Sequence, residues 1–408
     1  MVDYRARASD WAIGWQPAVT NRTRTRHGPG SRGPTGDHPA AGRREIECGG
    51  TLRRSSRLAR GSFAHQVNPT FLTDPPRPPA ILVCVEADRR CLNPTEPGAQ
   101  LQNAALSEEL ERRFPRLGPV RARFVYSSVH DVAHVDAGES SFALKLYRPG
   151  TRTTEDIAWE IDLHRHLSGN GAPVATLEAG LDGVIEHVFV DGIERTVVLT
   201  AWAPGTKPQP SIHTYRMVGR AAAAIHNASD NFTSPHPRAP RTLETEIDLQ
   251  VARLRPALEH VGRFHEVEAL GRRAATVLAR AAPQRGICHC DLTLDNVHIE
   301  NDRITVFDFD SAAEHWRAAE PQGVFHSAAM TGAPWWDAWR AGYAEVRDVA
   351  EQDENYVPWF VLIAQLENTA WKLGLTPTSV GTLLQRDDLP LLVDTWMLWA
   401  ATQCARSR

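Results

Sequence analysis

The chain has 408 residues, of which 42% are hydrophobic and 23% charged, and its formal net charge is −4. This length allows roughly two domains of ordinary size and the hydrophobic share is enough for a buried core, so the totals exclude collagen-like, coiled-coil and wholly disordered chains. Only three of the 45 basic residues are lysines, namely Lys145, Lys207 and Lys372, so a position where chemistry requires a lysine is easy to find.

The first hundred residues differ from the rest in charge and composition. They hold 15 arginines against 9 acidic residues, a net charge of +6, whereas residues 101–408 have a net charge of −10. The stretch 22–60 combines arginine with glycine, serine and proline and has few large apolar side chains, so burial cannot offset the entropy of ordering it. We therefore predict that 1–100 is a disordered basic leader, part of which lies outside the physiological product if the gene start is mis-assigned.

Signals for a membrane or an oxidising compartment are missing from the sequence. The most apolar windows, 80–85 and 389–401, are too short to cross a bilayer, and the N-terminus lacks the apolar run of a secretory signal. The six cysteines show no disulfide framework. The arginine-rich stretch has no aromatic residue before Phe63 on which bases could stack. We therefore expect a cytoplasmic protein without a membrane or nucleic-acid partner, and the sequence leaves its oligomeric state open.

From residue 101 onward, the apolar patterns predict a small sheet followed by helices. Thr153 and Thr154, followed by two acidic residues, mark the start of a helix that runs to 167. The other expected elements are a helix at 106–114, strands at 120–126, 132–135, 142–147, 184–189 and 196–201, helices at 215–226, 243–254 and 264–282, a strand pair at 296–299 and 304–307, and helices to the end. This order predicts an α+β chain: an antiparallel sheet with one helix in 101–203, and a mostly helical part in 204–404.

The strongest chemical pattern lies around the second strand pair. His289, Asp291 and Asn296 form an H-x-D-x4-N pattern, and Asp308 opens a D-F-D run after the pair. Transfer of a phosphoryl group from ATP to a hydroxyl needs a carboxylate that takes the hydroxyl proton, for which Asp291 is suited. Mg²⁺ takes oxygen ligands, and a tight hairpin turning at 300–303 would bring Asn296 and Asp308 to one ion. His289 is expected to hydrogen-bond the loop backbone.

A cation for the phosphates is predicted in the small sheet. Lys145 lies in the middle of an expected strand and is the only lysine in the first 200 residues, which indicates that a compact ammonium is required there. Glu160, in the helix that follows, can point back and hold it. The alternative is a lysine at a strand end whose ammonium reaches solvent.

Together these motifs resemble the aminoglycoside phosphotransferase and choline kinase superfamily over about residues 101 to 373. Within it, the nearer likeness is to the branch that contains stress response kinase A and type II homoserine kinase. The segments that carry the resemblance are 143–148, 219–226, 289–296, 306–310 and 342–343. The resemblance implies a bilobal protein-kinase-like fold, with a small antiparallel-sheet N-lobe and a larger helical C-lobe, and it implies ATP and Mg²⁺ as cofactors.

The resemblance also assigns roles to the residues of the pattern. It implies that Asp291 is the catalytic base and that Asn296 and Asp308 bind Mg²⁺. It implies that Lys145 binds phosphate and that Glu160 orients Lys145. The enzyme so described is a phosphotransferase with an alcohol group as acceptor.

The resemblance further implies where the nucleotide lies. Thr200, Ala201 and Trp202 fall at the family's hinge, which offers backbone groups to adenine. Ser127 and Ser128 lie in the turn that covers the phosphates. This turn carries no glycine, so hydroxyls and backbone N–H groups would have to take over the contact with phosphate.

The sequence does not identify the acceptor of the phosphoryl group. Asp337, Glu345, Glu367 and Asn368 suit a cationic acceptor such as an aminoglycoside or an amino alcohol, but a solvated helix face has the same composition. A protein serine or threonine is also an open acceptor. A hypothesis of a different class is a non-catalytic pseudokinase that binds nucleotide or a partner; the glycine-free turn favours it, and the intact phosphoryl-transfer residues oppose it.

Two further features stand outside this pattern. His130 and His134 have the spacing of a zinc pair on a helix, but they lie in strand-forming sequence. The potential zinc ligands at 288–290 are adjacent in the chain, so on a strand neighbouring side chains point to opposite faces. Zinc is therefore the weaker interpretation. Glu320 occupies a position at which the related family often has an aspartate. We expect this difference to affect the packing around residue 320 and not the phosphoryl transfer.

Overall fold

The computed structural model describes residues 97–190, 192–348, 351–379 and 382–406, all within one compact unit. The expected basic leader lies outside these residues except for its last positions, where helix α2, Pro97–Arg113, begins. Among the described residues, no helix is long and apolar enough to span a membrane.

The sheet is antiparallel throughout, with strand order β1-β2-β3-β6-β4 and β5 also paired with β6. Its strands are β1 Arg121–Ser127, β2 Asp131–Ala137, β3 Ser140–Leu146, β4 Leu177–Glu178, β5 Ile185–Val190 and β6 Ile193–Ala201. In β3, the side chains of Phe142, Leu144 and Leu146 are buried in the core. Because side chains alternate along a strand, this pattern places Lys145 on the opposite face of the sheet.

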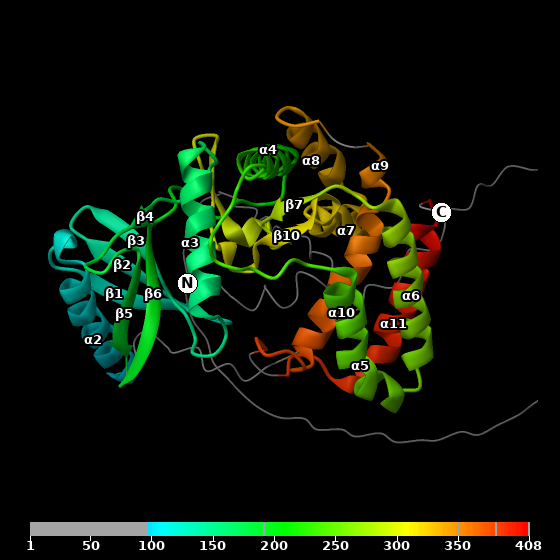
Figure 1. Ribbon diagram of the computed structural model, residues 1–408, viewed down its shortest axis with the longest axis horizontal. Helices are drawn as coiled ribbons and strands as arrows, with labels where there is room; N and C mark the ends of the chain where they lie inside the picture. The colour runs from blue at the N-terminus through cyan, green and yellow to red at the C-terminus, as the bar shows by residue number, and fades with distance from the viewer. Residues whose placement is uncertain (1–96, 191, 349–350, 380–381, 407–408) are drawn as a thin grey trace, which may run out of the picture. The chain divides into compact units, whose positions relative to one another are not determined.

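Two helices accompany the sheet. Helix α2 packs against β1 and β5, as Figure 1 shows, and buries Leu106 and Leu110 in the core of the sheet. Helix α3, Thr154–Gly169, begins at the N-cap Thr153, whose side chain and that of Asp156 form a reciprocal capping box. The predicted start of this helix is confirmed, and its buried face carries Glu160.

The remainder of the chain is mostly helical, with two short strand pairs. The helices are α4 Ile212–Ala228, α5 Leu249–His260, α6 Phe264–Ala281, α7 Gln322–Thr331, α8 Trp335–Ala344, α9 Glu351–Glu354, α10 Val357–Lys372 and α11 Leu389–Thr402. The pairs are β7 Arg285–Cys288 with β10 Ala313–Trp316, and β8 Val297–Glu300 with β9 Arg303–Val306. The expected helix at 243–254 opens instead with a π-helical turn, Glu244–Asp248, and strands β4, β7 and β10 were not predicted.

Helices α4 and α8 approach each other closely because each has a glycine at the contact. A Cβ atom on Gly219 would lie 2.1 Å from the carbonyl oxygen of Trp339, and one on Gly342 would lie 1.9 Å from that of Arg216. Both distances are too short for any side chain. The two glycines therefore fix how α8 lies on α4 and, with it, the position of Tyr343.

One apolar core joins the sheet region, which consists of strands β1–β6 with helices α2 and α3, to the helical region that follows β6. Leu163 and Leu167 of α3 share it with Val297 and Val306 of the β8–β9 hairpin and with Phe309. Because α3 also carries Glu160, this core sets the position of Glu160 relative to the residues that flank the hairpin.

Candidate active site

The loop of residues 289–296, which we call the 289–296 loop, brings together two of the residues singled out in the sequence. The Nδ2 group of Asn296 donates hydrogen bonds to the backbone oxygen and to Oδ2 of Asp291, both at 2.8 Å. The backbone N–H of Thr293 also donates to the Asp291 carbonyl at 2.9 Å. Asn296 is fully buried, so its amide holds the half-buried Asp291 in one orientation.

His289 holds the backbone of this loop, as predicted. Its Nε2 lies 3.1 Å from the carbonyl oxygen of Phe307, and its Nδ1 accepts from the N–H of Asp291 at 3.3 Å. The ring packs on Phe309 with 4.6 Å between centroids. Cys290, the residue between His289 and Asp291, has a φ of 63°, so the chain reverses sharply just before the candidate base.

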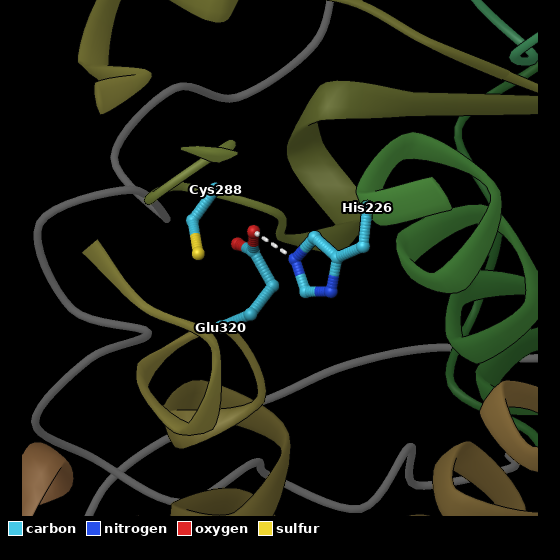
Figure 2. Close-up of side chains that lie close together, drawn as sticks. All are labelled: His226, Cys288 and Glu320. Atoms are coloured by element: carbon cyan, nitrogen blue, oxygen red, sulfur yellow. Dashed lines mark hydrogen bonds and ion pairs between the residues drawn. The ribbon is translucent and has the colours of Figure 1, made fainter. Parts of the chain in front are cut away.

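Glu320 anchors the same loop from the opposite side. Its carboxylate accepts from the backbone N–H of His289 at 2.7 Å and from that of Cys290 at 3.1 Å. Its Oε2 also lies 3.4 Å from Nε2 of His226 (Figure 2). Nδ1 of His226 contacts the hydroxyl of Tyr343 at 2.8 Å. Although burial alone would raise it, the hydrogen bonds from His226 and the loop lower the pKa of Glu320. The longer side chain at this position therefore reaches the loop, a role that the sequence did not reveal.

His226, Cys288 and Glu320 also form the one group of potential metal ligands found among the described residues, with ligand atoms within 4.8 Å of one another (Figure 2). Burial raises the pKa of Cys288 well above its usual value, so the thiol keeps its proton. Burial lowers the pKa of His226, and both of its ring nitrogens already have hydrogen-bond partners. Since Glu320 is also engaged with the loop backbone, we interpret the group as a hydrogen-bonded scaffold and not as a metal centre.

Lys145 lies within reach of three carboxylates. Its Nζ is 3.0 Å from Oε1 of Glu160, 3.4 Å from Oδ1 of Asp308 and 3.5 Å from Oδ1 of Asp310. The hydroxyl of Tyr147 donates to the other oxygen of Glu160 at 2.9 Å. Although burial alone would lower it, Glu160 and the neighbouring groups hold the pKa of Lys145 well above its usual value. The ammonium is therefore charged, and the contact with Glu160 is the one that the sequence predicted.

The β8–β9 hairpin places the two candidate metal ligands at the same end. Val297 pairs with Val306, and the N–H of Phe307 donates to the carbonyl of Asn296 at 3.0 Å, so Phe307 lies opposite Asn296 and Asp308 is the next residue. Asp308 has a φ of 67° and its side chain is 35% exposed. An amide oxygen and a carboxylate are the donors that a hard divalent cation takes, so these residues fit Mg²⁺.

The expected adenine segment lies at the end of β6. The N–H of Ala201 donates to Thr176 at 2.8 Å and that of Trp202 to Ser141 at 2.9 Å, so both are used within the sheet. The next residue, Ala203, is buried, and within the described part of the chain its N–H has no hydrogen-bond partner. This N–H is therefore a donor that the sheet does not use.

The side chains around this segment are aromatic. Nδ1 of His298 lies 2.8 Å from the carbonyl oxygen of Ala203. The ring of Trp202 packs edge-on against His134 and His298, with centroid distances of 4.5 and 6.0 Å. The hydroxyl of Thr200 donates to the carbonyl of Ala143 at 3.4 Å and so belongs to the sheet.

The turn between β1 and β2, residues 127–131, is closed by its own contacts. Ser127 Oγ donates to Oδ1 of Asp131 at 2.6 Å, and the N–H of Ser128 donates to the carbonyl of His130 at 2.9 Å. Nε2 of His130 then lies 3.0 Å from Oδ1 of Asp310. The sequence considered His130 only as one half of a zinc pair, so its contact with Asp310 was missed; Asp310 itself stood in the D-F-D run.

The acidic residues proposed for the acceptor have different surroundings. Glu345 contacts Arg216 and, at 3.4 Å, Arg220 on the surface of α4. Glu367 pairs with Arg241 at 3.0 Å. Arg241 also contacts Glu246 at 3.1 Å, so the carboxylate of Glu367 belongs to a cluster of ion pairs. The side chain of Glu367 is 42% exposed.

Comparison with known proteins assigns the family. The model of the phosphotransferase enzyme family matches residues 127–356, which is more than half of the chain. The chain belongs to this family. It is therefore a phosphotransferase of a family of small-molecule kinases, and it acts on a hydroxyl acceptor. The segments that carried the resemblance in the sequence lie within or next to the match, and the recognition of the superfamily is confirmed.

Individual relatives agree with this family. An uncharacterised protein of Deinococcus radiodurans is 30% identical over 260 residues, which cover 60% of this chain and 74% of the relative. Amicoumacin kinase of Bacillus subtilis is 23% identical over 202 residues, 48% of this chain and 60% of that protein. The solved structure of a microcompartment-associated aminopropanol kinase has a TM-score of 0.54 and 23% identity over 71% of this chain and 91% of its own. That likeness shows the fold, which is the predicted protein-kinase-like one.

Proposed function

We propose that this phosphotransferase moves the γ-phosphate of ATP, with Mg²⁺, to a hydroxyl of a small amine-bearing molecule. One observation carries the proposal. Lys145 lies 3.4 Å from Asp308, and Asp308 directly follows Phe307, the hairpin partner of Asn296, whose amide holds Asp291. A cation for phosphate, a pair of oxygen ligands and a carboxylate base therefore converge from separate segments of the chain.

Each residue then has a defined task in the transfer. Asp291 takes the proton of the acceptor hydroxyl as the hydroxyl oxygen bonds to the γ-phosphorus and the bond from that phosphorus to ADP breaks, and Asn296 keeps the Asp291 carboxylate aimed. Lys145 holds the α- and β-phosphates and is itself held by Glu160. Asn296 and Asp308 hold Mg²⁺, which supplies neutralisation of the triphosphate charge. Ser127 and Ser128 cover the phosphates.

The backbone at the end of β6 is the proposed base site. Thr200, Ala201 and Trp202 form its edge, and the N–H of Ala203 is the donor that we assign to the adenine ring, because the N–H groups of Ala201 and Trp202 are used in the sheet. The aromatic ring of Trp202 lies beside it. Recognition through the backbone leaves the residue types there unrestricted.

A cationic acceptor is supported by an exposed acidic side chain. Glu367 is 42% exposed at its side chain, and its carboxylate pairs with Arg241. Two of the similar proteins carry names of kinases for small molecules, one of them an amino alcohol. The cytoplasm, which supplies ATP and keeps the free thiols Cys288, Cys290 and Cys404 reduced, is the compartment that we propose.

The test is ATP turnover by purified protein against a panel of amino alcohols, aminoglycosides, homoserine and generic protein substrates. Asp291→Asn keeps the size and hydrogen bonds of the side chain but removes the base, so we expect kcat to fall by about 10²–10⁴-fold with nucleotide binding retained. The matched control is Asp302→Asn in the exposed hairpin turn, which should leave kcat unchanged.

The outcomes separate the candidates. Turnover with an amine-bearing small molecule and none with the hydroxyl analogue that lacks the amine supports the proposal. Full activity of Asp291→Asn contradicts the assignment of the base. Binding of ATP without transfer to any member of the panel favours the pseudokinase interpretation.

A further inference from the structure

Asp310 is a buried carboxylate that three elements of the sheet region contact at once. Its exposed fraction is 8%. Oδ1 accepts from Nε of Arg152 at 3.0 Å and lies 3.0 Å from Nε2 of His130, and Oδ2 accepts from Nη2 of Arg152 at 2.7 Å. Lys145 adds an ammonium 3.5 Å away. The family roles assigned above do not use His130, Arg152 or Asp310.

His130 is held at both ring nitrogens. Nδ1 accepts from the backbone N–H of Arg148 at 3.3 Å, and Nε2 faces Asp310. A ring that carries its proton on Nε2 satisfies both contacts. The ring is 5% exposed and packs on Tyr147 with 4.8 Å between centroids. Its orientation is therefore fixed, although it projects from a surface turn.

The same carboxylate connects the turn with the phosphate-binding lysine. Asp310 contacts Lys145, Lys145 contacts Glu160, and Glu160 accepts from the hydroxyl of Tyr147, on which His130 packs. The contacts close a ring. The position of the 127–131 turn is thus tied to the position of the ammonium.

Asp310 is in turn held from the helical region. The guanidinium of Arg238 donates to the backbone oxygen of Asp310, and its Nε donates to that of Ala312 at 3.1 Å. The side chain of Arg238 is 8% exposed and also contacts Asp156 on α3 at 3.3 Å. The carboxylate of Asp310 is therefore a fixed point, and the 127–131 turn takes its position from it.

We propose that His130, with Arg152, is a positioning residue for the nucleotide: the hydrogen bond from His130 to Asp310 fastens the glycine-free 127–131 turn over the phosphates beside Lys145. A glycine-rich turn covers phosphate by bringing its backbone close, which side chains on this turn hinder. A buried anchor at its tip replaces that freedom with a fixed position. The proposal rests on the proposed use of ATP at this site.

The experiment compares two variants of His130 that differ in one property. His130→Phe keeps a ring that can pack on Tyr147 and removes the donor to Asp310, whereas His130→Gln gives up the ring and keeps an N–H donor of similar reach. Binding of Mg²⁺-ATP is measured by calorimetry, and kcat and KM are measured separately for ATP and for the acceptor. Arg152→Met removes the second arm of the contact and serves if a His130 variant does not fold.

For His130→Phe we expect the KM and Kd for ATP to rise about tenfold, the effect of one hydrogen bond to a charged group. The acceptor KM and kcat should stay within about twofold, a split that a general loss of folding would not give. His130→Gln should recover most of the affinity, and Arg152→Met should raise the ATP KM in the same direction.

Affinity for ATP that is unchanged or tighter in His130→Phe overturns the inference, because the ring would then be neutral or would obstruct the phosphates. Equal losses in His130→Phe and His130→Gln also overturn it, since the donor would not matter. Failure of the wild-type protein to bind ATP at all is a different result, which refutes the proposed function itself.

Discussion

The two loops that carry the candidate site are held in place by different kinds of contact. The backbone N–H groups of His289 and Cys290 in the 289–296 loop donate to the almost fully buried carboxylate of Glu320, and the ring of His289 accepts from the N–H of Asp291. At 308–310, Asp310 is held by Arg152 and Arg238, whereas Asp308 contacts Lys145 and is still 35% exposed.

This difference separates a fixed part of the site from an adjustable one. Buried hydrogen bonds between neutral donors and Glu320 do not compete with a ligand, so the base Asp291 is oriented before any substrate arrives. Lys145, by contrast, is shared among three carboxylates, and a triphosphate is a further anion that competes for it. We expect ligand-induced change at Asp308 and Lys145, and not at Asp310 or at 289–296.

Removal of Glu320 should have the largest effect. Glu320→Ala leaves the N–H groups of His289 and Cys290 buried without an acceptor, and each such loss costs about 1–3 kcal/mol. We expect the free energy of unfolding in urea to fall by about 2–6 kcal/mol and kcat to fall with it, because Asp291 follows directly.

Glu320→Gln and Glu320→Asp refine this result. Glutamine keeps one acceptor oxygen and aspartate keeps two at a shorter reach, so both should lose less stability than alanine. A Glu320→Ala protein with wild-type kcat would show that the loop does not depend on this anchor, and the contrast between the two loops would fail.

Substitution of Lys145 should affect binding more than folding. In Lys145→Met the carboxylate of Asp310 still has Arg152 and His130, but among the described residues the buried Glu160 keeps only the hydroxyl of Tyr147, and the cation for phosphate is lost. We expect kcat/KM for ATP to fall by about 10²–10³-fold, the effect of removing a charge clamp, together with a loss in the free energy of unfolding from the unpaired Glu160. Lys145→Arg is the matched control, and wild-type kcat/KM in Lys145→Met would exclude the lysine from the nucleotide site.

The sequence predicted the fixed part of the site better than the adjustable part. Asp291 and Asn296 stand five residues apart on one loop, and Asn296 and Asp308 flank one hairpin, so spacing alone brings them together. Lys145 and Glu160 were paired because strand and helix follow each other in the chain. Contacts between residues that are close in the chain can be predicted from their spacing in the sequence.

The contacts that were missed join residues far apart in the chain. His130 meets Asp310 across 180 positions, and His289 meets Glu320 across 31. Neither pairing has a spacing that periodicity can reveal, since both depend on how β1–β2 and α7 are placed by the cores. Strands β7 and β10 were missed for a related reason: they are as short as the predicted β8 and β9, but they pair with each other across residues 289–312 and not through a tight hairpin turn. Strand β4 has only two residues, too few for an alternation to show.

Acid should destabilise the helical region through His326. His326 lies on α7, the helix after Glu320, and burial lowers its pKa to about 4. The unfolded chain takes up this proton near pH 6.5, before the folded one does, so stability is lost as the pH falls from 6.5 towards 4. In contrast, although burial alone would raise it, Lys145, His130 and Arg152 hold the pKa of Asp310 well below its usual range.

The His326 contribution at pH 5 is about 2 kcal/mol relative to pH 8, measured as the free energy of unfolding. His326→Phe, which keeps a ring against Trp399, should flatten the acid limb of the stability profile. A profile that is unchanged in this variant would assign the acid sensitivity to other groups.

The smallest effect is expected at Glu345, on the exposed side of the helical region. Its partners Arg216 and Arg220 are more than half exposed, and exposed ion pairs of this kind contribute about 0–1 kcal/mol. Glu345→Gln is therefore the isosteric counterpart of Glu320→Gln, with the same chemical change in a solvated setting. We expect kcat/KM for every amine-bearing acceptor to stay at the wild-type value. A loss confined to amine-bearing acceptors would instead place the acceptor at α8. Glu367 would then no longer be the candidate partner of the amine.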